Sequence, residues 1–304
     1  MLACSKRRRL LAGRGAVRSA SVRRPAVAGT WYPGTAQELA STIDGHLAVV
    51  DDDVKGDLVA LIAPHAGLMY SGPVAAHAYR LLSKRAFDTA VLVGPSHFVA
   101  FDGVAIVPSG GFETPFGVAW IDADCASALM AASSAIHDSP SAHTREHSLE
   151  MQLPFLQRLA PGTGIVPLLM GHQTSKAARL LGDALAAALR GRRALLVAST
   201  DLSHYHDAST AAALDGVVVD CVSHFDADRL QRALETRPEH ACGGGPTVAV
   251  MRASALLGAR DAIVLDRADS GDVSGDKSSV VGYMAAALGN FQDLHHGGDE
   301  GHGG

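Results

Sequence analysis

Three apolar segments of the sequence each end in residues that can bind metals or transfer protons. The segment LVALIAPHAG ends near His65, VLVGPSHFV contains His97, and ALLVASTDLSHYH brings Asp201 and His204 after a similar run. A neutral imidazole nitrogen is a ligand for transition metals, and an imidazole also transfers protons near neutral pH. A single histidine in such a place could simply cap a loop by hydrogen bonding. The repetition of the pattern favours one shared functional site.

Cys242 has the surroundings of a functional cysteine. It precedes three glycines and a proline in HACGGGPTVAV, at the expected start of an apolar helix. Glycines allow the backbone to approach a neighbour closely, and a helix N-terminus lowers the pKa of a thiol. Cys242 could therefore be a metal ligand or a nucleophile, or else a small buried residue beside a turn.

Further residues are candidates for the surroundings of this site. The segment EHSLEMQLP places His147 and Glu150 three residues apart, so on a helix they would share one face. This spacing is typical of carboxylate and histidine pairs that bind or support a metal, although such pairs are also common on helix surfaces. Ser96 precedes His97, and His172 follows an apolar run in LLMGHQ. We expect Ser96 to support the ligands or line the pocket of the same site, and His172 to lie at its rim.

The arrangement of apolar segments predicts the elements that position these residues. Continuous apolar strands indicate a sheet covered on both faces, and their alternation with helices predicts an α/β fold with a central mixed or parallel sheet flanked by helices. Ligands bind at the carboxyl ends of strands in such sheets. If residues 58–63, 89–93 and 194–199 form neighbouring strands, the three polar segments that follow them converge on one crevice. We also expect a helix over residues 147–159.

The two ends of the chain differ from the rest in composition. Residues 1–24 carry eight basic and no acidic residues, whereas the other 18 basic and 31 acidic residues give the remainder a formal charge of −13. We expect residues 1–25 to be a disordered basic arm, a transit-like peptide or an extension from a misassigned start. Residues 26–289 are expected to form a single domain, and the Gly- and His-rich residues 290–304 a disordered tail.

The overall composition excludes several classes of protein. The formal net charge of −5 does not favour a nucleic-acid binder. No stretch approaches the length of a membrane span. The four scattered cysteines contain no C-x-x-C pair, which argues against zinc-ribbon and thioredoxin-type sites. Reduced thiols are typical of the cytoplasm, and we expect a cytoplasmic location.

The ordered set of motifs is more specific than any one of them. It resembles the Memo-like family, also called AmmeMemoRadiSam system protein B, from about Ala26 to Leu288. The motifs that carry the resemblance are, in order, GTWYP, APHAG, YSG, GPSH, TPFG, EHSLEMQLPFL, STDLSHY, CGGGP and SSVVGYMAAAL.

The resemblance implies a fold similar to that of the class III extradiol dioxygenases, which are non-haem iron enzymes. By motif, it implies that His65, His97 and Cys242 hold a metal, and that Asp201 and His204 act as the nearby acid/base pair. It implies Fe(II), with Cu(I) or Cu(II) as the alternative because thiolate is a soft ligand. It also implies association with AMMECR-type and radical-SAM proteins.

The sequence departs from relatives beside the expected metal site. Phe98 follows GPSH where relatives often have a second histidine, and glycines follow Cys242 where some relatives have Arg and His. The residues to which the resemblance assigns the metal are retained, but these departures argue against transferring a relative's substrate to this chain. The fold alone also does not imply ring cleavage.

Three functional hypotheses follow. The first is a metal-dependent, redox-active protein, namely a dioxygenase-type oxidoreductase that takes a small molecule into its cleft. The second is a non-catalytic adaptor that binds metal or a peptide in the same cleft. The third makes Cys242 a nucleophile with His204 as its base, as in a hydrolase or transferase.

Overall fold

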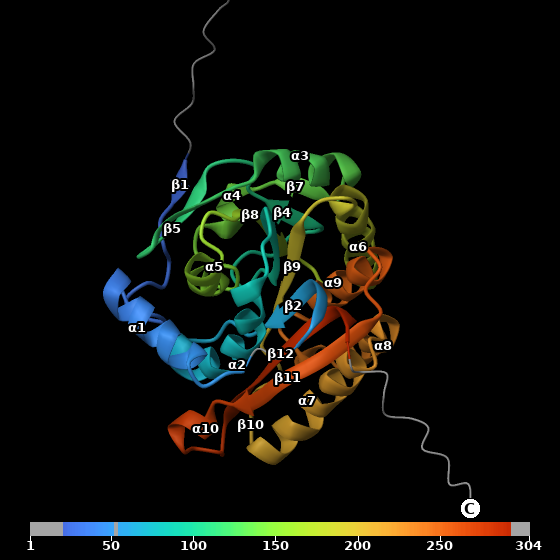
Figure 1. Ribbon diagram of the computed structural model, residues 1–304. Coiled ribbons are helices and arrows are strands. Elements are labelled where there is room, and N and C mark those ends of the chain that lie inside the picture. Colours follow the sequence, from blue (N-terminus) through green and yellow to red (C-terminus); the bar gives the residue numbers. More distant parts are fainter. Residues whose placement is uncertain (1–20, 52–53, 293–304) are drawn as a thin grey trace, which may run out of the picture.

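The computed structural model describes residues 21–51 and 54–292 and shows a mixed β-sheet covered by helices on both faces (Figure 1). Within these residues the main sheet has nine strands in the order β10-β12-β2-β9-β3-β8-β4-β7, and β11 also pairs with β12. The bounds are β2 (Gly56–Ala63), β3 (Thr89–Pro95), β4 (Val104–Ile106), β7 (Ile136–Asp138), β8 (Gly164–Met170), β9 (Ala194–Ser199), β10 (His204–His206), β11 (Asp261–Asp269) and β12 (Val280–Phe291). Strands β2, β9, β3 and β8 are parallel, whereas β12 and β4 run antiparallel to β2 and β8. The predicted α/β fold with a central mixed sheet is confirmed.

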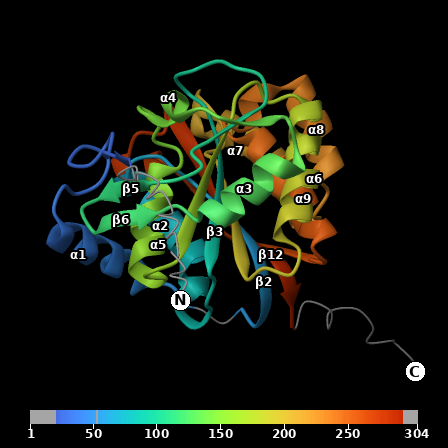
Figure 2. The ribbon, with the colours of Figure 1, turned by 90° about the horizontal axis from the view of Figure 1, so that it is seen from above.

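The helices connect these strands and cover both faces of the sheet (Figure 2). Their bounds are α1 (Ala36–Leu47), α2 (Leu68–Arg80), α3 (Ala123–Ala132), α4 (Pro140–His143), α5 (Leu153–Leu159), α6 (Ser175–Leu189), α7 (Ala208–Ser223), α8 (Ala227–Thr236), α9 (Gly244–Leu256) and α10 (Gly271–Ser274), with 3₁₀ turns at Leu81–Lys84, Glu150–Gln152 and Pro238–His240. In the part of the chain that the structure describes, no helix has both the length and the apolar character needed to span a bilayer.

The sheet separates two apolar cores because successive side chains of a strand point to opposite faces. In β2, Leu61 packs with the core formed by α1, α2 and α5, whereas Ile62 packs with the core on the side of α6 and α9. Both side chains are fully buried. This double coverage explains why the strands are continuously apolar in sequence rather than alternating.

The parallel strands bring the predicted site residues to one edge of the sheet. Strand β9 lies between β2 and β3, and all three run in the same direction. Their carboxyl ends at Ala63, Ser199 and Pro95 therefore lie side by side. His65, Asp201 and His97 follow these ends within two residues.

The structure corrects the expected boundary of the basic arm. Residues 22–23 form strand β1 (Val22–Arg23), which pairs with β5 (Gly111–Thr114) in a small sheet completed by β6 (Gly117–Trp120). The Arg23 side chain is largely buried and forms an ion pair with the fully buried Glu150. Residues 21–25 thus belong to the folded domain, and residues 1–20 lie outside the described residues.

Two further boundaries differ from expectation. Strand β12 continues to Phe291, so the domain extends past the predicted end at residue 289; residues 293–304 lie outside the described residues. The helix expected over 147–159 begins only at Leu153, after a 3₁₀ turn. Pro154 occupies its first turn, where a residue without an N–H is tolerated. His147 and Glu150 consequently do not share a helical face.

Candidate metal centre

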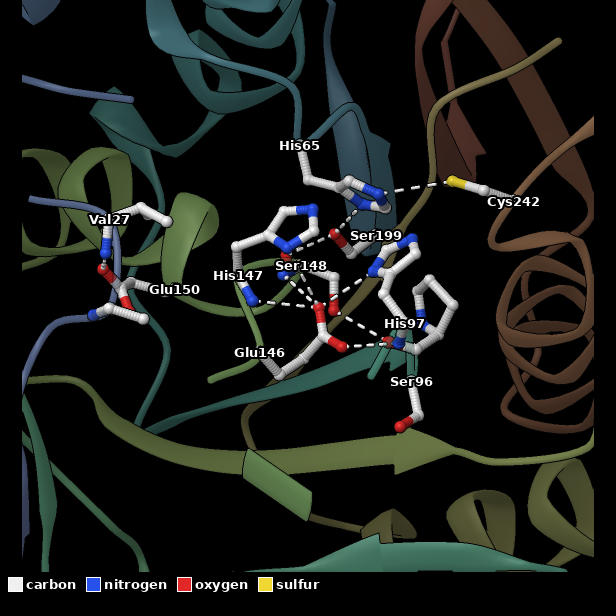
Figure 3. A network of polar contacts seen from close by, with 12 residues as sticks. Val27, His65, Ser96, His97, Glu146, His147, Ser148, Glu150, Ser199 and Cys242 are labelled. Atoms are coloured by element: carbon white, nitrogen blue, oxygen red, sulfur yellow. Dashed lines mark hydrogen bonds and ion pairs between the residues drawn. The ribbon is translucent and has the colours of Figure 1, made fainter. Parts of the chain in front are cut away.

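The three expected metal ligands lie together at the carboxyl edge of the sheet (Figure 3). One ligand atom from each of His65, His97 and Cys242 lies within 4.8 Å of the others. The Sγ atom of Cys242 is 3.3 Å from Nε2 of His65, and the rings of His65 and His97 have centroids 5.3 Å apart. Two imidazoles and a thiol are a donor set that suits first-row transition metals.

His65 is held deep in the site. It is 1% exposed, and burial lowers the pKa of its imidazole well below the usual value. Its Nδ1 atom lies 2.9 Å from Oγ of Ser199 at the end of β9. The imidazole is therefore neutral, which is the protonation state that binds a metal.

His97 is oriented by Glu146, the residue that directly precedes His147. The Glu146 carboxylate lies 2.9 Å from Nδ1 of His97 and accepts the backbone N–H of the same residue at 2.6 Å. It also accepts the backbone N–H groups of His147 and Ser148. Burial opposes ionisation of Glu146, but the hydrogen bonds and the charge interaction with His97 lower its pKa to about 2. A carboxylate behind a metal-binding histidine is a common supporting arrangement, and neither the sequence spacing nor a motif had indicated it.

Cys242 approaches the site because glycine follows it. A Cβ on Gly243 would lie 2.3 Å from the carbonyl oxygen of Ser199, so a larger residue would push this segment away from β9. The backbone N–H of Asp201 points at Sγ of Cys242 from 3.4 Å. The expected lowering of the thiol pKa by the helix N-terminus is not found, because burial and the nearby Asp201 carboxylate raise it. Helix α9 begins only at Gly244.

Asp201 and His204 both lie at the site but do not form the expected pair. The Asp201 carboxylate accepts the backbone N–H groups of His65 and Ala66, at 2.7 and 3.2 Å. Burial raises the pKa of Asp201 to about 7 even though these hydrogen bonds oppose the shift. Nδ1 of His204 lies 2.9 Å from the carbonyl oxygen of Leu202, which can only accept, so Nδ1 carries the proton. Among the described residues, Asp201 supports His65 and not His204.

The ligands open into a pocket of about 360 Å³. His147 lies on its wall, with its ring stacked 4.6 Å from that of His97 and covered by Trp31 at 4.3 Å. The lining residues are Trp31, His65, Ala66, His97, His147, Asp201, His204, Tyr205, Cys242 and Val281. Its size and its mixture of aromatic and polar groups suit a small organic ligand.

The other predicted pocket residues lie elsewhere. Glu150 points away from the ligands and accepts hydrogen bonds from the backbone of Val27 and from the hydroxyl of Tyr32 (Figure 3). Ser96 donates to the carbonyl oxygen of Val99, and its side chain points away from the imidazoles (Figure 3). His172 is exposed and is not among the residues that line this pocket in the described part of the chain. Only His147 of these four predictions is placed beside the metal ligands.

A second trio, His97, Glu146 and His147, also has atoms close enough to hold a cation. The Glu146 carboxylate in this trio already accepts the hydrogen bonds from His97, His147 and Ser148. We therefore interpret Glu146 as the group that orients His97 rather than as a ligand.

Comparisons with known proteins identify relatives along nearly the whole domain. The family model described as Memo-like protein matches residues 23–287. A protein of Ignicoccus hospitalis described as a MEMO1 family protein is 39% identical over 277 residues, which cover 87% of this chain and 97% of that protein. A MEMO1 family protein of Methanothermobacter thermautotrophicus is 40% identical over 276 residues, covering 86% and 98%. The crystal structure of an uncharacterized Escherichia coli K12 protein aligns with a TM-score of 0.53 and 15% identity, over 77% of this chain and 100% of that one, which shows a shared fold.

Proposed function

The chain belongs to the Memo-like family, and we propose that it binds one transition-metal ion through His65, His97 and Cys242. The observation that carries this proposal is the convergence of two imidazoles and a thiol at the base of one pocket. These residues follow β2 and β3 and precede α9, so rigid elements position all three.

The residues present fit a metal ion. Bond lengths of about 2.0 Å to nitrogen and about 2.3 Å to sulfur place such ligand atoms about 3.5 Å apart across a tetrahedral angle. Sγ of Cys242 and Nε2 of His65 are 3.3 Å apart. Burial raises the pKa of the Cys242 thiol, and a metal cation would supply the positive charge that stabilises its thiolate.

We propose Fe(II) as the metal because the family resembles non-haem iron dioxygenases and imidazole suits iron, and copper is the alternative because thiolate is a soft ligand that favours Cu(I). Either ion would supply redox chemistry at the base of the pocket. Three side chains would hold the ion, which is the number of protein ligands typical of catalytic rather than structural metal sites. This supports a metal-dependent oxidoreductase of the dioxygenase type that acts on a small molecule.

The chain's own residues would bind and orient that molecule. Trp31 and Tyr205 flank the pocket and offer aromatic faces for packing. His204 has its Nδ1 proton committed to Leu202, which leaves Nε2 free to accept a proton from a bound ligand. Burial lowers the pKa of His204, so its imidazole is neutral at neutral pH and its Nε2 lone pair is available to a ligand.

The structure weighs against Cys242 as a free nucleophile. Burial raises the pKa of its thiol, whereas a nucleophilic cysteine needs a lowered one. The Cys242 sulfur also contacts the imidazole of His65 and not that of His204, which the nucleophile hypothesis had assigned as the base. The contact of this sulfur with Nε2 of His65, a second candidate ligand atom, favours a metal ligand.

Metal analysis of anaerobically purified protein tests the proposal. We expect about one iron or copper ion per chain in the wild type, and loss of that metal in His65→Ala and in Cys242→Ser. His77→Ala is the matched control, because His77 lies on α2 and pairs with Asp266 at the surface. Wild-type protein that contains no metal, and takes up neither Fe(II) nor Cu(I), would overturn the proposal and leave peptide binding as the leading hypothesis for the pocket.

A further inference from the structure

We infer that Ser199 and Gln152 are positioning residues that fix His65 in the tautomer with the proton on Nδ1, so that Nε2 faces Cys242. This inference deepens the proposed metal site and rests on it for its functional meaning. The tautomer itself can be measured without any metal. The three residues belong to different elements: β9, a 3₁₀ turn and the loop after β2.

The hydroxyl of Ser199 has one proton to donate but lies within hydrogen-bonding distance of three polar atoms. The contacts with His65 and Ser148 are drawn in Figure 3. The Oγ atom of Ser199 lies 2.6 Å from the carbonyl oxygen of Ser148, 2.8 Å from Nε2 of Gln152 and 2.9 Å from Nδ1 of His65. A carbonyl oxygen only accepts, so the single hydroxyl proton goes to Ser148. Both nitrogen neighbours must then donate to Ser199.

The side-chain amide of Gln152 has a fixed orientation, which supports the conclusion that its nitrogen donates to Ser199. Its Nε2 donates to the carbonyl oxygen of Pro64 at 3.0 Å, and its Oε1 accepts the hydroxyl of Tyr79 at 2.7 Å. The reverse orientation would place the amide oxygen against the carbonyl oxygen of Pro64. The amide NH₂ group therefore faces Ser199 and occupies one of its two lone pairs.

His65 must use the remaining lone pair of Ser199 as a donor. The other tautomer would place an unprotonated Nδ1 against an oxygen that has no proton left to give. Ser199 and Gln152 are 0% exposed and His65 is 1% exposed, so solvent does not reach these atoms to relieve the mismatch. With the proton on Nδ1, the lone pair of Nε2 is left on the side where Cys242 Sγ lies at 3.3 Å. Hydrogen-bond partners of this kind raise metal affinity by 10–100-fold in known metal sites.

Nitrogen-15 NMR of metal-free protein tests the tautomer directly. Two-bond proton–nitrogen correlations distinguish Nδ1–H from Nε2–H in each histidine ring, and the His65→Gln spectrum assigns the signals. We expect Nδ1–H for His65 in the wild type and a shift toward Nε2–H in Ser199→Ala. Ser199→Thr keeps the hydroxyl and should keep Nδ1–H. Ser71→Ala is the matched control, because it also removes a buried hydroxyl bonded to a carbonyl near His65.

Cobalt(II) titration of the same proteins measures the consequence for the site. We expect Ser199→Ala to bind Co(II) about 10–100-fold more weakly than wild type, whereas Ser71→Ala binds it as wild type does. A wild-type spectrum with Nε2–H on His65 would overturn the inference, even if Ser199→Ala does not fold. An unchanged Nδ1–H in folded Ser199→Ala would also overturn it. Failure of the wild type to bind Co(II), Fe(II) or copper would instead count against the proposed function, while the NMR result still decides the tautomer.

Discussion

The carboxylate of Glu146 binds His97 at two points, accepting its backbone N–H at 2.6 Å and lying 2.9 Å from its ring Nδ1. A carboxylate with a pKa of about 2 is ionised at neutral pH and only accepts, so Nδ1 of His97 donates to it, and the metal-binding form of the ring carries its lone pair on Nε2. The same tautomer follows for His65 from its contact with Ser199. Two unrelated supporting groups thus leave both imidazoles with Nε2 available for a metal.

Glu146→Gln should weaken metal binding while leaving the fold intact. The amide keeps the size of the side chain but loses the charge and one of the two acceptor oxygens. Removal of such a supporting group typically costs 10–100-fold in metal affinity. Competitive titration of Fe(II) or Co(II) under anaerobic conditions would measure the loss.

Asp44→Asn is the control for that change, because Asp44 is an exposed carboxylate paired with Arg158 on the surface. We expect its metal affinity to equal that of the wild type. Equal affinities for Glu146→Gln and wild type would show that Glu146 does not support the metal site.

Arg23→Ala should destabilise the folded domain strongly. Arg23 donates to Glu150 at 2.6 Å and to the carbonyl oxygens of His143 and Glu146, and Glu150 is fully buried. Removing the guanidinium leaves a buried carboxylate without its countercharge, which costs about 3–5 kcal/mol. Urea unfolding followed by tryptophan fluorescence would measure the change in the free energy of unfolding.

The matched control is Arg158→Ala, which breaks an ion pair of the same 2.6 Å length whose two side chains are about half exposed. Exposed pairs contribute less than about 1 kcal/mol. Similar losses for the two variants would contradict the account of residues 21–25 as part of the folded domain.

His143 should make the protein sensitive to acid. Its side chain is 1% exposed, its Nε2 lies 3.2 Å from the carbonyl oxygen of Ala105, and burial lowers its pKa to about 4. The unfolded chain takes up a proton near the usual pKa of about 6.5, whereas the folded chain does not. Stability is therefore fully present above about pH 6.5 and is lost as the pH falls toward 4, by up to about 3 kcal/mol.

The measurement is the free energy of unfolding between pH 7.5 and 4, compared for wild type and His143→Gln, which cannot titrate there. We expect the variant to lose about 3 kcal/mol less than wild type across this range. Parallel pH profiles for the two proteins would show that His143 does not contribute to acid sensitivity.

The sequence predicted the strands of the fold best where both faces of the sheet are buried. The apolar runs that became β2, β3 and β9 are covered on both faces, so their composition alone identified them. Short elements such as β1 and β5 were not predicted, because they contain few residues and depend on pairing with distant segments. The position of the Arg23 side chain depends on its ion pair with Glu150, which lies 127 residues away in the chain.

The site was predictable to the extent that strands end in functional residues. His65, His97 and Cys242 were identified from their positions and from the family resemblance, and the structure places them together. The roles of Glu146, Ser199 and Gln152 depend on three-dimensional hydrogen bonding between segments that no local pattern connects. Glu150, which we expected to support the ligands or line the pocket, points away from the ligands because a 3₁₀ turn and not a regular helix follows His147.

The most direct test of the metal centre is a crystal structure of the protein loaded anaerobically with Fe(II), with anomalous diffraction measured at the iron edge. We predict one strong anomalous peak bonded to Nε2 of His65, Nε2 of His97 and Sγ of Cys242, at distances of about 2.0–2.4 Å. A peak bonded to other residues, or a map with no peak in protein that diffracts well, would contradict the account.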